Sequence, residues 1–156
     1  MAIHHLFRKQ LVPISPEKAW KFFSDPYNLQ KITPEDMGFV VRSYSGPKRL
    51  HPGQIIVYTV KPLLGIPLTW VTEITHALEP EFFVDEQRLG PYMFWHHKHY
   101  IRKVEGGVEM IDSIHYKVLY GWIGSVINRL MVEKKLKKIF DYRARKIKSL
   151  FGEFPA

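Results

Sequence analysis

The chain has 156 residues, of which 46% are hydrophobic and 14% aromatic, and it carries a formal net charge of +8. This length predicts a single domain over residues 1–156 with a sizeable core, and the hydrophobic content excludes a disordered chain. The absence of cysteine excludes disulfides and thiolate metal sites, and no apolar run is long enough for a membrane span. Because the N-terminal residues lack the apolar stretch of a signal peptide, the expected location is the cytoplasm.

The first third of the chain predicts one strand and two short helices. Residues 5–12 alternate in the manner of a strand. Ser15 suits the N-cap of a helix and Pro16 its first position. Pro26 ends this helix and Pro34 ends a second one, since the residue before a proline is disfavoured in helical conformation.

A series of strands follows. Aromatic and β-branched residues, separated by turns rich in glycine and proline, predict strands over 39–44, 54–61, 68–78, 82–89, 92–104 and 108–119. Gly90-Pro91 joins the fourth and fifth of these strands. Gly106-Gly107 is expected to be a two-residue hairpin turn, which would place His97 opposite Tyr116.

The strand over 92–104 alternates strongly, so its two faces can be assigned. One face is predicted to carry Met93, Trp95, His97, His99 and Ile101. The other, wetter face is predicted to carry Tyr92, Phe94, His96, Lys98, Tyr100 and Arg102. The expected register adds Asp112 and Tyr116 to the first face, which points inward. An inward face with both aromatics and imidazoles is more typical of a pocket than of a dry core.

The region 121–151 is predicted to be helical and basic. It contains nine Lys or Arg and two acidic residues, a net charge of +7. Its apolar stripe changes phase, which predicts a bend near residues 130–133. The basic face can be a solvated outer surface, or it can dock with Trp122 on an anionic membrane. Nucleic acid is not an expected partner, because the sequence contains no recognisable nucleic-acid-binding motif.

The order of these elements predicts an α+β fold with a helix-grip arrangement. About seven antiparallel strands would form a curved sheet wrapped around a long C-terminal helix, with two short helices between the first and second strands. Such a sheet leaves a cavity between itself and the helix.

Three segments carry a resemblance to a known family. They are Ser-Pro-Glu-Lys-Ala-Trp-Lys-Phe-Phe from Ser15, Gly-Pro-Tyr with Trp-His-His-Lys-His over 90–99, and Ile-Phe-Asp-Tyr-Arg over 139–143. The chain resembles the START-like (SRPBCC, helix-grip) superfamily, in particular an uncharacterised bacterial ligand-binding branch sometimes labelled cell division inhibitor. The resemblance implies binding or transport of a small hydrophobic molecule, lipid or polyketide-like. Some members of the superfamily are instead cyclases, dehydratases or hydrolases.

The expected ligand site combines apolar walls with polar anchors. The predicted walls are Tyr58, Trp70, Trp95 and Tyr116, and the predicted anchors are Asp85, Gln87, His97, His99 and Asp112. Two other interpretations stay open for the anchors: a metal site built on the His-x-His pair with Asp112 as the carboxylate ligand, and general acid–base catalysis. A regulatory module that binds a protein partner through the basic helix is a third possibility. Binding rather than catalysis is expected, with no cofactor or metal.

Overall fold

The computed structural model describes residues 3–62, 65–118 and 131–154. Its strands are β1 (His4–Val12), β2 (Val40–Tyr44), β3 (Ile55–Val60), β4 (Leu68–Leu78), β5 (Phe82–Leu89), β6 (Tyr92–Val104) and β7 (Gly107–Val118). Its helices are α1 (Pro16–Phe23), α2 (Pro26–Lys31), the 3₁₀ turn η1 (Glu35–Met37) and α4 (Glu133–Phe151). The expected start of the last helix, its bend and Trp122 lie outside the described residues.

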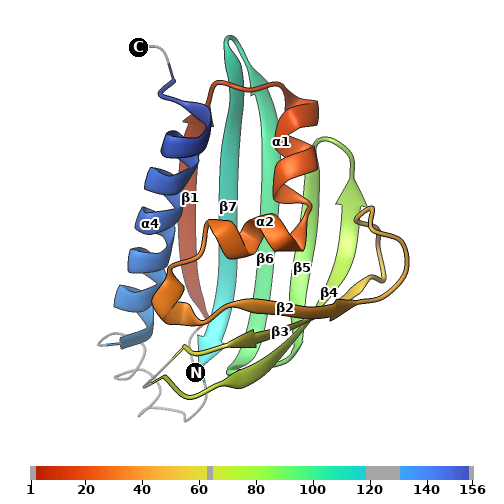
Figure 1. Cartoon of the computed structure of the whole chain (residues 1–156), viewed down its shortest axis with the longest axis vertical. Coiled ribbons are helices and arrows are strands. Elements are labelled where there is room, and N and C mark those ends of the chain that lie inside the picture. The colour runs from red at the N-terminus through yellow and green to blue at the C-terminus, as the bar shows by residue number, and fades with distance from the viewer. Residues whose placement is uncertain (1–2, 63–64, 119–130, 155–156) are drawn as a thin grey trace.

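The seven strands form one sheet in the order β1-β7-β6-β5-β4-β3-β2. Every neighbouring pair is antiparallel. Figure 1 shows β1 and β5–β7 running along the long axis, whereas β2 and β3 cross it near the lower end, so the sheet is strongly curved. Helices α1 and α2 lie in front of the sheet, and α4 runs beside β1. The α+β prediction with two short helices between the first two strands is confirmed.

Local capping explains why the short helices begin where they do. The Ser15 hydroxyl accepts a hydrogen bond from the backbone N–H of Lys18 at 3.2 Å, and Pro16 follows at the first helical position. In α2 the Asp25 carboxylate accepts from the backbone N–H of Tyr27 at 3.0 Å. These two caps fix the positions of both helices over the sheet.

The register of the last hairpin differs from the prediction. Gly107 pairs with Val104, so the turn is Glu105-Gly106 and His97 lies opposite Ile114 rather than Tyr116. Gly106 supplies the positive φ of the turn, whereas a Cβ on Gly107 would collide with a backbone oxygen of β1. Because the register moves by an even number of residues, each side chain keeps its predicted face.

The core consists of two hydrophobic clusters. The larger cluster joins α1 to the sheet through residues such as Trp20 and Ile74, and it includes Ile147 of α4. The smaller cluster consists of Trp95, Ile114, Tyr116, Leu136 and Phe140. Trp70 packs against both clusters. Helix α4 is therefore held by one cluster near its start and by the other near its end.

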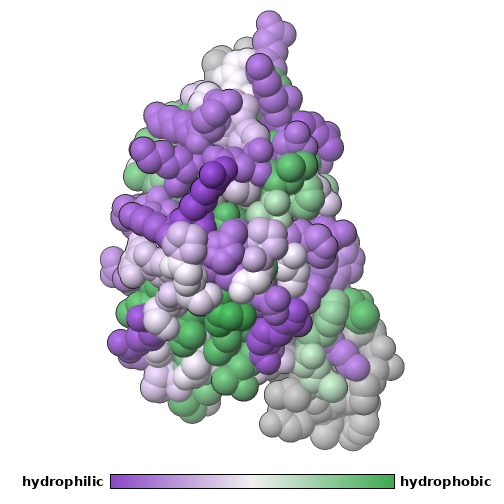
Figure 2. Space-filling view, turned by 90° about the vertical axis from the view of Figure 1, so that its right-hand side faces the viewer, coloured by the Kyte–Doolittle hydropathy of each residue, from purple (hydrophilic) through white to green (hydrophobic). Residues whose placement is uncertain are grey.

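The outer surface is mainly polar. Figure 2 shows a face that is largely hydrophilic, with hydrophobic side chains gathered toward its lower end. Exposed apolar residues of the neighbouring strands β4, β5 and β6 include Leu68, Leu89 and Met93. Within residues 3–62, 65–118 and 131–154, no helix is long and apolar enough to cross a membrane.

Candidate ligand-binding site

A cavity of about 690 Å³ lies between the concave face of the sheet and helices α2 and α4. This volume is within the range of small-molecule sites. Seven of the nine predicted site residues line it: Tyr58, Trp70, Asp85, Trp95, His97, His99 and Asp112. They come from β3 to β7, so the curvature of the sheet brings them around one space.

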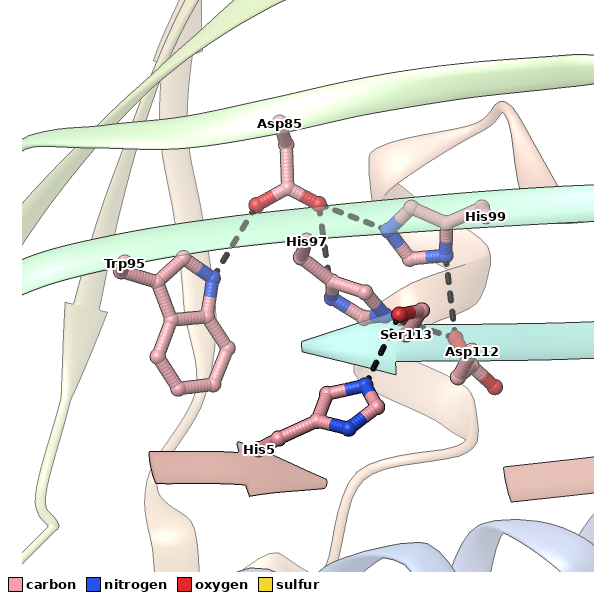
Figure 3. A network of polar contacts seen from close by, with 7 residues as sticks. All are labelled: His5, Asp85, Trp95, His97, His99, Asp112 and Ser113. Carbon is pink, nitrogen blue, oxygen red and sulfur yellow. Dashed lines mark hydrogen bonds and ion pairs between the residues drawn. The ribbon is translucent and has the colours of Figure 1, made fainter. Parts of the chain in front are cut away.

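Asp85 on β5 gathers the polar side chains of β6. Its Oδ1 accepts a hydrogen bond from Trp95 Nε1 at 3.3 Å, and its Oδ2 accepts from His99 Nε2 at 2.6 Å (Figure 3). The Nδ1 of His97 lies 3.5 Å from the same Oδ2. The strand pairing explains this arrangement, because Asp85 lies directly opposite His97.

Asp112 on β7 closes the network from the other side. Its Oδ1 accepts from His97 Nε2 at 2.7 Å and lies 3.2 Å from His99 Nδ1 (Figure 3). The two imidazole rings lie between the carboxylates, with their centroids 3.6 Å apart. Each of the four imidazole nitrogens is therefore within 3.5 Å of a carboxylate oxygen.

The carboxylates are ionised. Burial alone would raise the pKa of Asp112, but hydrogen bonds and charge from His97 and His99 outweigh it and lower that pKa well below its usual range. The pKa of Asp85 is lowered for the same reason: the two imidazoles and the Trp95 indole outweigh the effect of burial.

The two imidazoles have opposite pKa shifts. Burial and the neighbouring ring of His99 lower the pKa of His97, although Asp85 and Asp112 partly offset this. Burial would also lower the pKa of His99, but its hydrogen bonds to Asp112 and Asp85 raise it overall. His99, which bridges the two carboxylates, therefore holds a proton more strongly than His97 does, and a neutral His97 can still donate from Nε2 to Asp112.

The same side chains offer donors for a metal ion. Ligand atoms of Asp85, His97 and His99 all lie within 4.8 Å of one another. The sequence pointed to Asp112 as the carboxylate of such a site, whereas the converging group contains Asp85. A cation could bind there only after His99 lost a proton, because a protonated imidazole nitrogen has no free lone pair.

The structure does not bring Gln87 and Tyr116 to the cavity. The Gln87 side chain donates to the backbone carbonyl of Tyr92 at 2.7 Å and accepts from the Tyr92 N–H at 3.2 Å. It therefore holds the Gly90-Pro91 turn. Tyr116 is buried in the smaller cluster, with its ring 5.4 Å from that of His4, and it lines a separate small pocket at β1.

Tyr92 lines the cavity, although the alternation of β6 predicted the opposite face. The register shifts between Tyr92 and Phe94, so one extra residue enters the strand at its start. Met93, predicted to point inward, is consequently 51% exposed. A turn ending in proline just before the strand is the only sequence signal for this irregularity.

Arg143 also lines the cavity, although the sequence placed it among the solvated cations of the basic helix. It follows Leu136 and Phe140 at helical spacing and precedes Ile147, so it lies on the apolar face of α4. Burial lowers the pKa of Arg143, and the attraction of Asp112 and Asp85 offsets this only in part. The sequence signal for this placement was that residue 143 occupies a position of the apolar stripe between residues 140 and 147.

Comparison with known proteins gives matches in structure only. No protein-family model matches the chain. No curated protein matches it either. The Zhui aromatase/cyclase from Streptomyces sp. R1128 superposes with a TM-score of 0.73 at 10% identity, over 96% of this chain and 93% of the other. Protein CV1439 from Chromobacterium violaceum gives 0.71 at 13% identity, over 97% and 99%.

A third similar structure is Ara h 8.0201, with a TM-score of 0.60 at 16% identity over 95% of this chain and 99% of the other. Identities this low show a common fold and nothing about activity. Coverage of nearly the whole chain agrees with the sheet order, the two short helices and the long last helix described above. The chain has a helix-grip fold, the fold that the resemblance of its sequence motifs implied.

Proposed function

We propose that this protein binds a small, mainly hydrophobic molecule in the cavity between the sheet and α4. The observation that carries the proposal is a cavity of about 690 Å³ with aromatic walls and one group of converging polar side chains. Tyr58, Trp70 and Trp95 supply apolar area, and the His/Asp network lies at one wall. Small-molecule sites usually combine these two features. The similarity in fold to a protein named as an aromatase/cyclase fits the handling of such a ligand.

The network supports binding more directly than catalysis. A general base or acid must have a nitrogen or oxygen within hydrogen-bond reach of the reacting group. All four nitrogens of His97 and His99 are instead directed at Asp85 and Asp112. The network thus fixes the cavity wall and orients Trp95, whose indole N–H it also binds.

Native mass spectrometry of gently purified protein, followed by extraction, tests the binding proposal. The informative variant is Ala144→Trp, because Ala144 lines the cavity from α4 and a large ring there would fill it. The matched control is Ser149→Trp, which adds the same ring at an exposed position of the same helix. We expect a co-purifying apolar molecule in wild type and control and its loss in Ala144→Trp. Apo masses throughout, with no binding in calorimetry of lipid and polyketide panels, would refute the proposal.

Acid–base catalysis on the bound molecule is the second candidate function. The observation in its favour is that two adjacent imidazoles have their pKa values shifted in opposite directions, as in many acid–base pairs. Turnover of the extracted molecule by wild type, abolished in His97→Gln with binding retained, would establish it. Unchanged ligand after long incubation with wild type would exclude it for that ligand.

We also propose that the ligand is exchanged at an anionic membrane surface. Exposed Lys134 and Lys138 of α4 and Asp36 of η1 line the cavity, so it reaches the surface at this point. Met131, also lining, is 46% exposed beside these lysines. Cations next to an apolar side chain suit a membrane interface. Sedimentation with anionic vesicles, but not with zwitterionic ones, is expected, and Lys134→Glu should weaken it more than Lys148→Glu.

A further inference from the structure

Arg143 brings a positive charge to the cavity wall. Its guanidinium carbon lies 4.6 Å from the centroid of the Phe140 ring. Its Nε is buried and has no hydrogen-bond partner among residues 3–62, 65–118 and 131–154. The carboxylates of Asp85 and Asp112 form their ion pairs with the two imidazoles and none with Arg143.

A guanidinium without a hydrogen-bond acceptor is unusual inside a protein. Arginine carries five N–H donors, and buried polar groups nearly always find partners. Stacking on Phe140 satisfies the face of the guanidinium but none of its donors. Arg143 lines a cavity large enough for a ligand, so the ligand itself is the natural source of an acceptor.

We infer that the ligand carries a carboxylate and that Arg143 binds it. This inference deepens the proposed function and rests on it. The planar fork of a guanidinium matches the two oxygens of a carboxylate and binds them with paired hydrogen bonds. The apolar body of the ligand would then lie against Tyr58 and Trp70, which line the same cavity. The ligand class is an amphipathic carboxylic acid.

Charge favours a carboxylate over a phosphate. Asp85 and Asp112 already bring two carboxylates to this cavity. A carboxylate ligand adds one negative charge, which the guanidinium of Arg143 can pair. A doubly charged phosphate would add two, and one of them would stay unpaired in a partly buried site, where unpaired charge is costly.

Calorimetry with matched pairs of probes tests the inference. The pairs are dodecanoate with 1-dodecanol, and 2-naphthoate with 2-naphthalenemethanol, so each pair differs only in its polar group. Wild type should bind the acid of at least one pair about tenfold to a hundredfold more tightly than the alcohol, as expected for charge-assisted hydrogen bonds. Salt of about 0.3 M weakens any contribution from the exposed lysines.

Arg143→Met should remove the preference for the acid, so that acid and alcohol bind with about equal affinity. Arg143→Lys should retain part of the preference, because it keeps the charge and loses the fork. Arg145→Met is the matched control, since Arg145 is exposed on the same helix, and it should behave as wild type.

The outcomes separate the inference from the proposed function. Equal affinity for acid and alcohol in wild type would overturn the inference and leave binding of a hydrophobic molecule intact. A preference that survives in Arg143→Met would also overturn it, because another cation would then hold the acid. Failure of both members of both pairs to bind would count against the proposed function and the inference together.

Discussion

His97 and His99 have their ring centroids 3.6 Å apart, yet their pKa values are shifted in opposite directions. The difference arises from how the carboxylates approach each ring. His99 has both nitrogens within 3.2 Å of a carboxylate oxygen, whereas His97 has one at 2.7 Å and one at 3.5 Å. The ring with the two shorter contacts, His99, therefore binds a proton more tightly than His97 does.

The raised pKa of His99 predicts a loss of stability as the pH rises above about 6.5. The folded state holds this proton more tightly than the unfolded chain, so its contribution is complete below about pH 6.5 and falls as pH rises through the folded pKa. We expect the melting temperature of wild type to fall over this window. In His99→Gln the slope should be smaller, while the exposed control His76→Gln should keep the wild-type slope. Parallel curves for all three proteins would contradict the assigned protonation.

Asp85 is predicted to be the most sensitive position of the network. Asp85→Asn removes the charge that pairs with the two imidazoles, and it keeps only one of the two acceptor oxygens that bind Trp95 and His99. The cost should be about 3 kcal/mol in the free energy of unfolding, as for other broken buried ion pairs. Urea denaturation measures it. Glu86→Gln is the control on the outer face, where its partners are His96 and Arg88, and should cost less than about 1 kcal/mol.

Gln87 should matter for stability and not directly for ligand contact. Gln87→Ala removes two hydrogen bonds to the backbone of Tyr92 and should cost about 1–2 kcal/mol. Because Tyr92 lines the cavity, ligand affinity should change only as far as that side chain moves. Urea denaturation and calorimetry on the same preparation separate the two effects. A large loss of affinity with unchanged stability would show that Gln87 binds the ligand after all.

Arg143→Met should stabilise the ligand-free protein. The pKa of Arg143 is lowered even though Asp112 and Asp85 act to raise it, so burial of the cation costs more than their attraction returns. Replacing it with an apolar side chain on the apolar face of α4 should raise the free energy of unfolding by about 1 kcal/mol. Arg145→Met, on the exposed face, should leave it nearly unchanged. A clear destabilisation by Arg143→Met would mean that the cation is a structural partner of the two carboxylates.

The fold was predictable because more than one kind of sequence signal identifies its helices and strands. Proline and capping residues delimit α1 and α2, and strict alternation defines the strands. The inward face of β6 was predicted correctly at Trp95, His97 and His99 even though the pairing with β7 was wrong. A register error of two residues leaves each side chain on the same face of the sheet. The prediction of this part of the site therefore required only the alternation along the strand.

The remaining errors have local causes that alternation cannot reveal. An extra residue at the start of β6 turns Tyr92 inward and Met93 outward. The Gln87 side chain is held by the backbone of Tyr92, three residues beyond the end of its own strand. Arg143 was counted as a surface charge by composition, although its helical position is an apolar one. In each case the position of the side chain is determined by residues that are close in space, and the local sequence pattern does not reveal them.

Because the core is divided into two clusters, the two ends of α4 pack against different sets of side chains. Ile147 anchors the end of the helix in the larger cluster, whereas Leu136 and Phe140 pack its beginning against the smaller one and Lys138 pairs with Asp36 at the surface. The first turns can detach from Trp95 and Ile114 while the last turns remain docked, which is a local opening rather than global unfolding. Backbone amides near Leu136 should then exchange hydrogen for deuterium sooner than those near Ile147, and a molecule packed against Phe140 would slow them selectively.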